Sequence, residues 1–416
     1  MADGIQLAFQ AAQLAARESY GRLVAILAGR TRDVAQAEDA LADAFAAALR
    51  EWPLHGVPDS PNAWLIAVAK RKHIDATRRN KSHADAASHL LLLAEELENM
   101  AATSPSIPDE RLALMFACAH PAIDPDIRSP LILQTVLGMT AEQIASSYLV
   151  SAATMGQRLA RAKAKIKLAG IPFQVPAADE FAERLDAVLD AIYAMFDQAW
   201  SNYDLAENGL AEDALWFSSL LSELQPNQPE PLGLSALILY LHARLRARRD
   251  SKGLFVPLAE QDVTLWDDAM IDRAEILLRR ASAMNRIGRF QLEAAIQSVH
   301  TTRRLTLVTD WKAISQLYEA LYRVTGSPVV QLNLAYAIGE DQGWPVGLAA
   351  IPALDVFPEL ATYQPYFAVR ATLREKCGQT TGALEDYDRA IEIEKDQTVT
   401  DFLAQRRDRL RAATLQ

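Results

Sequence analysis

The segment Met139–Lys167, "MTAEQIASSYLVSAATMGQRLARAKAKIK", combines two helix starts with a compact run of positive charge. Thr140 is suited to cap a first helix, and Ser151 is suited to cap a second helix after a short turn. No acidic residue follows Glu142 in this segment, whereas five basic residues follow from Arg158 onward. The pattern therefore predicts a helix, a three-residue turn and a basic helix.

The second predicted helix has one apolar face and one adjacent basic face. Each face repeats at the spacing i, i+4, i+7, i+11, and the two faces are rotated by about 100°. In a helix-turn-helix the second helix enters the DNA major groove, where its first residues reach base edges and basic residues hold phosphates. An ordinary amphipathic helix with a solvated charged face is the alternative, but such a face normally mixes both signs of charge. The predicted apolar stripe is Met155, Leu159, Ala162 and Ile166, and the candidate DNA-binding residues are Ser151, Thr154, Gln157, Arg158, Arg161, Lys163 and Lys165.

Charge divides the chain into two parts. The 416 residues carry a formal net charge of −11, and their number predicts two or three domains. Residues 1–176 contain 18 Lys+Arg and 18 Asp+Glu, whereas the rest contains 24 and 35. Only the second part is therefore repelled from a polyanion. This change in charge and the prolines of "GIPFQVP" (170–176) predict a domain boundary here.

Composition also restricts the class of protein. The two cysteines, Cys118 and Cys377, are far apart, which argues against a disulfide framework and suits a reducing cytoplasm. The N-terminal residues do not have the pattern of a signal peptide. The longest apolar run, at 232–241, is too short to span a bilayer. We therefore expect a soluble cytoplasmic protein without a membrane partner.

Helical periodicity extends over nearly the whole chain, so we predict an all-α fold. Proline combined with glycine or polar residues marks breaks at 52–61, 103–109, 120–126 and 170–176. The breaks predict a first helical domain at 1–85, a linker at 86–107, a compact helical domain at 108–172 and a C-terminal domain at 177–416.

The C-terminal domain contains a segment, 366–396, that resembles one tetratricopeptide unit. Small residues would let its two antiparallel helices approach closely, and Tyr387 would fill the space between them. We predict a tetratricopeptide-like array of helices, with a single irregular helical domain as the competing interpretation. The small residues are Ala368, Gly378, Ala383 and Ala390.

Two further helices are predicted in the N-terminal part. Asp33 is a candidate cap for the first of them. Its predicted core stripe is Val34, Ala37, Leu41, Phe45 and Ala48. The acids Glu38, Asp39 and Asp43 lie off this stripe and are predicted to form an exposed patch. A merely solvated face is the alternative for these acids. The second helix begins at Ser60-Pro61, a favourable start. It carries Trp64, Lys70, Arg71, Lys72, Arg78 and Arg79, of which Trp64 is favoured as a core residue over a base-stacking one.

These motifs resemble those of bacterial extracytoplasmic-function sigma factors of the sigma-70 family. The stretch 139–176 and "DERLALMFACAHPAID" (109–124) resemble region 4, and residues 20–79 resemble region 2. Later segments resemble the subgroup that has a tetratricopeptide-like C-terminal extension. The chain departs from the pattern of that subgroup at two places: Val263 stands where an Arg is common, and "DQAW" (197–200) stands where an Asn-Glu-Gly-Tyr stretch is common.

The resemblance implies specific partners. Region 4 reads the −35 promoter element, and the basic helix of region 2 meets the −10 element, where the loop at 53–60 occupies the place of the base-capturing loop. "AEDALADAF", with Glu38, Asp39 and Asp43, corresponds to the surface that docks on the β′ clamp helices of RNA polymerase, whose β flap is a further expected contact. Such docking uses complementary charge.

We therefore predict a sigma factor that binds core polymerase and promoter DNA, and is not itself an enzyme. No cofactor is predicted, and no metal, because Cys118 and His120 lack a second pair at ligand spacing. The acidic C-terminal domain is expected to regulate the protein through an intramolecular contact or to bind a protein partner. A helix-turn-helix regulator with a tetratricopeptide-like sensor is the alternative, and a protein-binding helical scaffold is the third interpretation.

Overall fold

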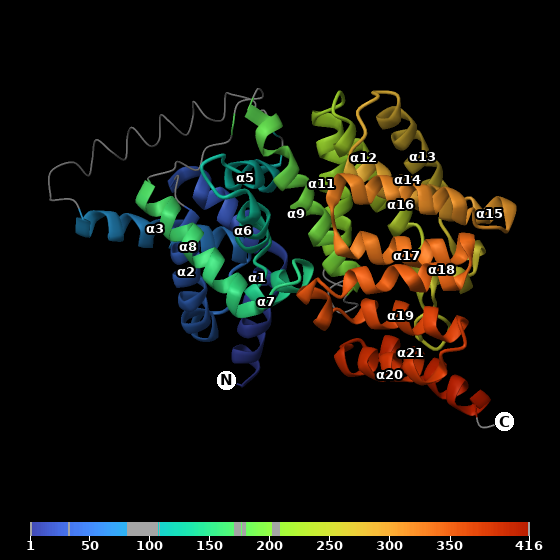
Figure 1. Ribbon diagram of the computed structural model, residues 1–416. Coiled ribbons are helices and arrows are strands. Elements are labelled where there is room, and N and C mark those ends of the chain that lie inside the picture. Colours follow the sequence, from blue (N-terminus) through green and yellow to red (C-terminus); the bar gives the residue numbers. More distant parts are fainter. Residues whose placement is uncertain are drawn as a thin grey trace. The chain divides into compact units, whose positions relative to one another are not determined.

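A computed structural model describes residues 2–31, 34–80, 107, 109–169, 176, 180–201 and 209–414. Within these ranges the regular structure is helical and contains no strand, so the all-α prediction is confirmed. The chain forms two compact units, Met1–Gln198 and Ala199–Gln416. Figure 1 shows the helices of both units.

The first three helices of unit 1 form a bundle. They are α1 (Ala2–Thr31), α2 (Val34–His55) and α3 (Pro61–Asn80), and α1 packs against both of the others. The predicted core positions Ala37, Leu41 and Ala48 are buried, whereas Phe45 is only half-buried because Ala44 occupies the centre of the buried face. Asp33 and the side chain of Val34 lie outside the described residues.

The break predicted at 52–61 begins later than expected. Helix α2 continues through Pro53 to His55, and the connecting loop covers only residues 56–60. Pro53 lacks the N–H that would donate to the carbonyl of Leu49, so the helix loses one hydrogen bond there and ends two residues later. The prediction that the next helix begins at Pro61 is confirmed.

Four more helices of unit 1 follow after Asp109, whose side chain caps the first of them by accepting from the backbone of Arg111 and Leu112. Gly138, at φ +66°, ends the second one in a left-handed conformation that glycine adopts without strain. The break predicted at 120–126 is confirmed. The helices are α5 (Glu110–Cys118), α6 (Pro125–Leu137), α7 (Ala141–Ser147) and α8 (Ala152–Ala169).

Helix α9 (Phe181–Ser201) packs against this second group of helices. Near its start, the ring of Phe181 stacks on Phe116 of α5 with the centroids 4.7 Å apart. Near its end, the Gln198 amide donates to the two serine hydroxyls that close α7, at 2.9 and 2.7 Å. Most of α9 therefore belongs to unit 1, so the boundary between the units follows Gln198 and lies one helix later than the charge pattern predicts.

Unit 2 is a succession of helix pairs. Figure 1 shows α14, α16, α17 and α19 stacked in chain order, and each packs against the next. The side chain of Asp267 caps α13 by accepting from the backbone of Met270. The α-helices are α11 (Leu210–Leu224), α12 (Pro229–His242), α13 (Asp268–Ser282), α14 (Arg289–Thr301), α15 (Arg303–Thr306), α16 (Trp311–Thr325), α17 (Pro328–Gln342), α18 (Trp344–Ala350), α19 (Gln364–Lys376), α20 (Thr380–Ile393) and α21 (Gln397–Thr414).

The long apolar run of the sequence forms α12, which is buried on nearly all sides by α11, α13 and α14. A helix that is apolar all round has to be buried in this way. Its Tyr240 hydroxyl finds a partner in the Glu275 carboxylate of α13, at 2.6 Å. In the described parts of the chain, no helix combines the length and the apolar character that crossing a membrane requires.

The helices α19 and α20 form the hairpin predicted at 366–396. Ala383, Ala390 and Tyr387 are fully buried, so their predicted packing roles are confirmed. Gly378 has a different role, because at φ +73° it closes the turn between the helices. Ala368 is only half-buried.

Candidate nucleic-acid interface

Helices α7 and α8 form a helix-turn-helix whose two starts are capped as the sequence predicts. The Thr140 hydroxyl accepts from the backbone of Gln143, and the Gln143 side chain accepts from the backbone of Thr140, at 3.2 and 2.8 Å. The turn contains Leu149 at φ 51°, a left-handed conformation that is uncommon for a branched side chain. The Ser151 hydroxyl then accepts from the backbone of Thr154 at 3.1 Å and starts α8.

The first helix of the motif is fixed to its neighbours. Ile144 is fully buried, and the Tyr148 hydroxyl lies 2.5 Å from the hydroxyl of Ser129 on α6. Together with the two bonds from Gln198 of α9, these contacts hold α7 between α6 and α9. The basic helix therefore starts from a rigid support.

The two predicted faces of α8 are present. The apolar stripe Met155, Leu159, Ala162 and Ile166 is buried, whereas Ser151, Thr154, Gln157, Arg158, Arg161 and Lys165 are exposed. The hydroxyls of Ser151 and Thr154 also bond to one another at 2.8 Å, so both take part in the cap. The three exposed cations of α8, Arg158, Arg161 and Lys165, have no ion-pair partner among the described residues.

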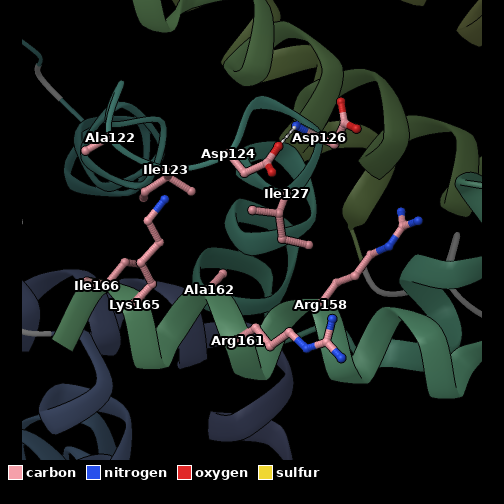
Figure 2. Close-up of a pocket in the computed structure, with 10 residues that line it drawn as sticks. All are labelled: Ala122, Ile123, Asp124, Asp126, Ile127, Arg158, Arg161, Ala162, Lys165 and Ile166. Atoms are coloured by element: carbon pink, nitrogen blue, oxygen red, sulfur yellow. Dashed lines mark hydrogen bonds between the residues drawn. The ribbon is translucent and has the colours of Figure 1, made fainter. Parts of the chain in front are cut away.

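The exposed cations of α8 line one wall of a groove of about 360 Å³. Figure 2 shows Lys165 extending toward Ile123, and Asp124 and Asp126 at the start of α6 on the opposite wall. The sequence does not indicate these two acids as site residues, because "IDPD" has only the pattern of a helix start. Their carboxylates reduce the net positive charge of the groove, which disfavours indiscriminate contact with phosphates.

Lys163 differs from its predicted role. Its ammonium forms an ion pair with the Glu38 carboxylate of α2 at 2.7 Å, and the two side chains are 27% and 15% exposed. The predictions that Lys163 is free for phosphates and that Glu38 belongs to an exposed patch are therefore wrong for this structure. The reason is tertiary, since residues 125 positions apart neutralise each other where α8 approaches α2.

The remaining acids of the predicted patch, Asp39 and Asp43, are exposed on α2. The negative charge of this part of α2 acts on Tyr20 of α1. Burial, followed by the charges of Glu38 and Asp39, raises the pKa of Tyr20 to about 12. Of the three acids in the predicted patch, two therefore remain exposed.

The predicted −10 residues lie on α3. Trp64 is half-buried, and its ring packs edge-on against buried Trp52, with the centroids 5.4 Å apart. Lys70 is half-buried and engaged with neighbouring groups, whereas Arg71 is exposed. The side chains of the other predicted residues, Lys72, Arg78 and Arg79, lie outside the described residues.

Cys118 is buried, and this burial raises the pKa of its thiol. His120 uses its Nδ1 atom as an acceptor for the backbone of Ala122 at 3.1 Å. Across the described ranges, His, Cys, Asp and Glu side chains form no cluster of three or more that could hold a metal ion.

Comparison with known proteins identifies two segments of the chain. Residues 16–83 match the model of sigma-70 region 2, and residues 184–282 match a family of unknown function (DUF6596). A curated relative from Rhizobium meliloti (strain 1021), "Uncharacterized protein R00370", is 37% identical over 388 residues, which cover 92% of this chain and 91% of the relative. No solved structure matches the chain.

The chain belongs to the family of this relative, and its sigma-70 region 2 supports a role as a sigma factor of the sigma-70 family. A sigma-70 region 2 implies interaction with core RNA polymerase and promoter DNA in general, and indicates a transcription factor rather than an enzyme. The matched segment 16–83 covers α1 from its middle onward, all of α2 and all of α3.

Proposed function

We propose that this chain is a sigma factor of the extracytoplasmic-function type, in which α7 and α8 form the region 4 unit that reads the −35 element. The observation that carries the proposal is the face of α8, where every charged residue exposed to solvent is basic. This helix follows a rigid, capped turn in the same unit as region 2.

The geometry supports distinct roles along α8. Gln157 and Arg158 lie near its start, where side chains of a recognition helix reach base edges. Arg161 and Lys165 lie farther along the same exposed face and suit phosphate contacts. Ser151 and Thr154 fix the start of the helix through their mutual bond, and remain exposed for contact with DNA.

Region 2 supplies the second promoter contact and the polymerase contact. Arg71 is exposed on α3 and suits a phosphate of the opened −10 strand, while Trp64 supports the helix by packing on Trp52. Asp39 and Asp43 on α2 suit the β′ clamp helices, by charge complementarity. The β flap is the proposed partner of region 4.

The C-terminal unit is proposed to regulate the sigma module or to bind a protein partner. Its successive helix pairs resemble tetratricopeptide arrays, which bind peptides and proteins. Its excess of acidic residues makes it a poor binder of DNA. A fragment made to test this role should end after Ser201, because α9 packs against α5 and α7 of unit 1.

Run-off transcription from genomic fragments, with purified core polymerase, tests the proposal. Specific starts are expected only when the chain is added, and the double substitution Arg158→Ala with Arg161→Ala should abolish them. Each lost phosphate contact should lower the slope of log affinity against log salt by about 0.9. Lys312→Ala, which removes one exposed cation of α16, is the surface control.

A second measurement separates a sigma factor from a helix-turn-helix regulator. Asp39→Asn with Asp43→Asn should weaken binding to core polymerase, whereas Glu51→Gln, exposed on the same helix, should not. Specific DNA binding without any core binding would instead identify a regulator that is not a sigma subunit. Absence of both would leave the scaffold interpretation.

A further inference from the structure

Three arginines of unit 2 lie where the chain leaves α12 and α14. Arg244 lies between α12 and the 3-10 helix η2 (Leu245–Arg248), Arg248 ends that helix, and Arg303 begins α15 directly after α14. A second 3-10 helix, η4 (Val263–Leu265), packs against both η2 and α15, so these segments meet. Arg244 is only 3% exposed, and its positive charge is therefore held away from water.

The hydrogen-bond partners of Arg244 are neutral. Its Nε atom donates to the backbone oxygen of Tyr240 at 3.3 Å, and its Nη2 atom donates to the side-chain oxygen of Gln297 at 2.5 Å. Neutral acceptors satisfy hydrogen bonds without cancelling the charge. Burial, followed by the charges of Arg248 and Arg303, lowers the pKa of Arg244 to about 9. Among the described residues, no carboxylate forms an ion pair with Arg244.

Other arginines with little exposure in this chain have a carboxylate partner. Arg370 pairs with Asp386 at 2.6 Å, and Arg184 pairs with Glu180 at 3.0 Å. Proteins pair their buried charges in this way because burying an unpaired charge is costly. Arg244 departs from this rule, which indicates that its counter-charge comes from outside the chain.

Two further buried polar groups near Arg303 lack a partner. Arg303 donates to the backbone oxygens of Ala259 and Gln261, at 2.6 and 3.0 Å, and its guanidinium carbon lies 5.2 Å from the centre of the Trp266 ring. In the described part of the chain, the buried indole N–H of Trp266 has no acceptor and the buried side-chain oxygen of Gln261 has no donor. A ligand with both anionic oxygens and an O–H group could satisfy the two of them.

We propose that the cluster formed by Arg244, Arg303, Trp266 and Gln261 binds a phosphate ion. Hydrogen phosphate offers anionic oxygens to the two guanidinium groups and to the indole N–H, and it keeps a proton to donate to the Gln261 side chain. A carboxylate ion lacks that proton. The burial of Arg244 and Trp266 favours a small ion over a phosphate group on a macromolecule. Because the cluster lies wholly within unit 2, the proposal is independent of promoter recognition by unit 1.

Isothermal titration calorimetry of the full chain with sodium phosphate, in a phosphate-free buffer at constant ionic strength, tests the site. We expect saturable binding of one ion per chain. Acetate and sulfate should bind more weakly, since neither carries an O–H group at neutral pH. Hydrogen exchange with mass spectrometry should show that phosphate slows exchange in peptides from 243–248, 259–267 and 300–306.

Two variants assign the binding to the cluster. Arg244→Met should lower the affinity for phosphate by about tenfold or more, because it removes hydrogen bonds to a charged ligand. Trp266→Phe keeps an aromatic ring beside Arg303 and removes only the indole N–H, so it should lower the affinity several-fold. Since that N–H has no acceptor in the described part of the chain, Trp266→Phe should leave Tm in chloride buffer unchanged.

Stability in chloride buffer separates a binding role of Arg244 from a structural one. Arg244→Met should leave Tm unchanged or raise it, because an apolar side chain of similar length replaces an uncompensated charge. Arg370→Met is the matched control. It removes an arginine that compensates the buried carboxylate of Asp386, so it should lower Tm and leave the affinity for phosphate unchanged.

Several results would overturn the proposal. Absence of saturable phosphate binding would remove the site altogether. Unchanged affinity in both Arg244→Met and Trp266→Phe would place the bound ion elsewhere. Acetate or sulfate binding as tightly as phosphate would contradict the choice of ligand. A loss of Tm in Arg244→Met as large as that in Arg370→Met would show that Arg244 serves the fold instead.

Discussion

Replacement of Gly21 by alanine tests the packing of α1 on α6 with a single methyl group. The new Cβ atom would lie 1.6 Å from the Val136 carbonyl oxygen, whereas ordinary contacts begin at about 3.4 Å. Because the obstacle is backbone, it cannot rotate away, and the two helices must separate by more than an ångström. Overpacking of this kind costs about 1–3 kcal/mol, partly offset by about 1 kcal/mol from the better helix propensity of alanine.

Thermal unfolding of the full chain is the assay. For a unit of roughly 200 residues, each kcal/mol shifts Tm by about 2–4 °C, so Gly21→Ala should lower the transition of unit 1 by several degrees. Gly156→Ala in α8 is the matched control, because its Cβ atom would meet only Ala141, at 3.9 Å. This control should raise stability by up to about 1 kcal/mol, since only the propensity gain remains.

A variant with unchanged Tm would show that Gly21 and Val136 are not in contact in solution. The close packing inferred between the regions would then be wrong.

Three further substitutions probe other parts of the fold. Asp386→Ala removes a 3%-exposed carboxylate that pairs with two arginines at 2.6 and 2.8 Å, and should lower the free energy of unfolding by about 3–5 kcal/mol in chemical denaturation. Asp388→Ala on the same helix is the control and should lower it by less than about 1 kcal/mol. Burial and two neighbouring arginines lower the pKa of His300 to about 3. The stabilisation from the neutral imidazole is therefore fully present above about pH 6.5 and is lost as the pH falls from there toward 3, at no more than about 1.4 kcal/mol per pH unit. His300→Gln should flatten this slope in urea unfolding at different pH values. Tyr148→Phe removes the hydroxyl bonded to buried Ser129 and should destabilise unit 1 by about 1 kcal/mol in urea titrations.

Local features of the chain were predictable because they depend on neighbours in sequence. The caps at Thr140 and Ser151 and the buried stripe of α8 follow from residue types at fixed helical spacing. The same reasoning predicted the buried Tyr387 of the hairpin formed by α19 and α20. Region 2 was recognisable for the same reason, since its motif is a continuous stretch of sequence.

Features that join distant segments were not predictable in this way. The charge pattern places a boundary after residue 176, yet α9 belongs to unit 1, because Phe181 and Gln198 find their partners on α5 and α7. Likewise, Asp124 and Asp126 read as the start of a helix, and only the packing of α6 beside α8 places their carboxylates in the groove.

The sequence by itself thus determined the helices, their buried faces and the basic surface of α8, because each follows from a periodic pattern within one segment. Only the tertiary structure decided which of those charged side chains remain exposed and able to bind a partner. Lys163 and Glu38 are indistinguishable in sequence from their exposed neighbours Lys165 and Asp39. The approach of α8 to α2 pairs the first two and leaves the others free for binding, since an ion pair depends on a distance in space that helical spacing does not specify.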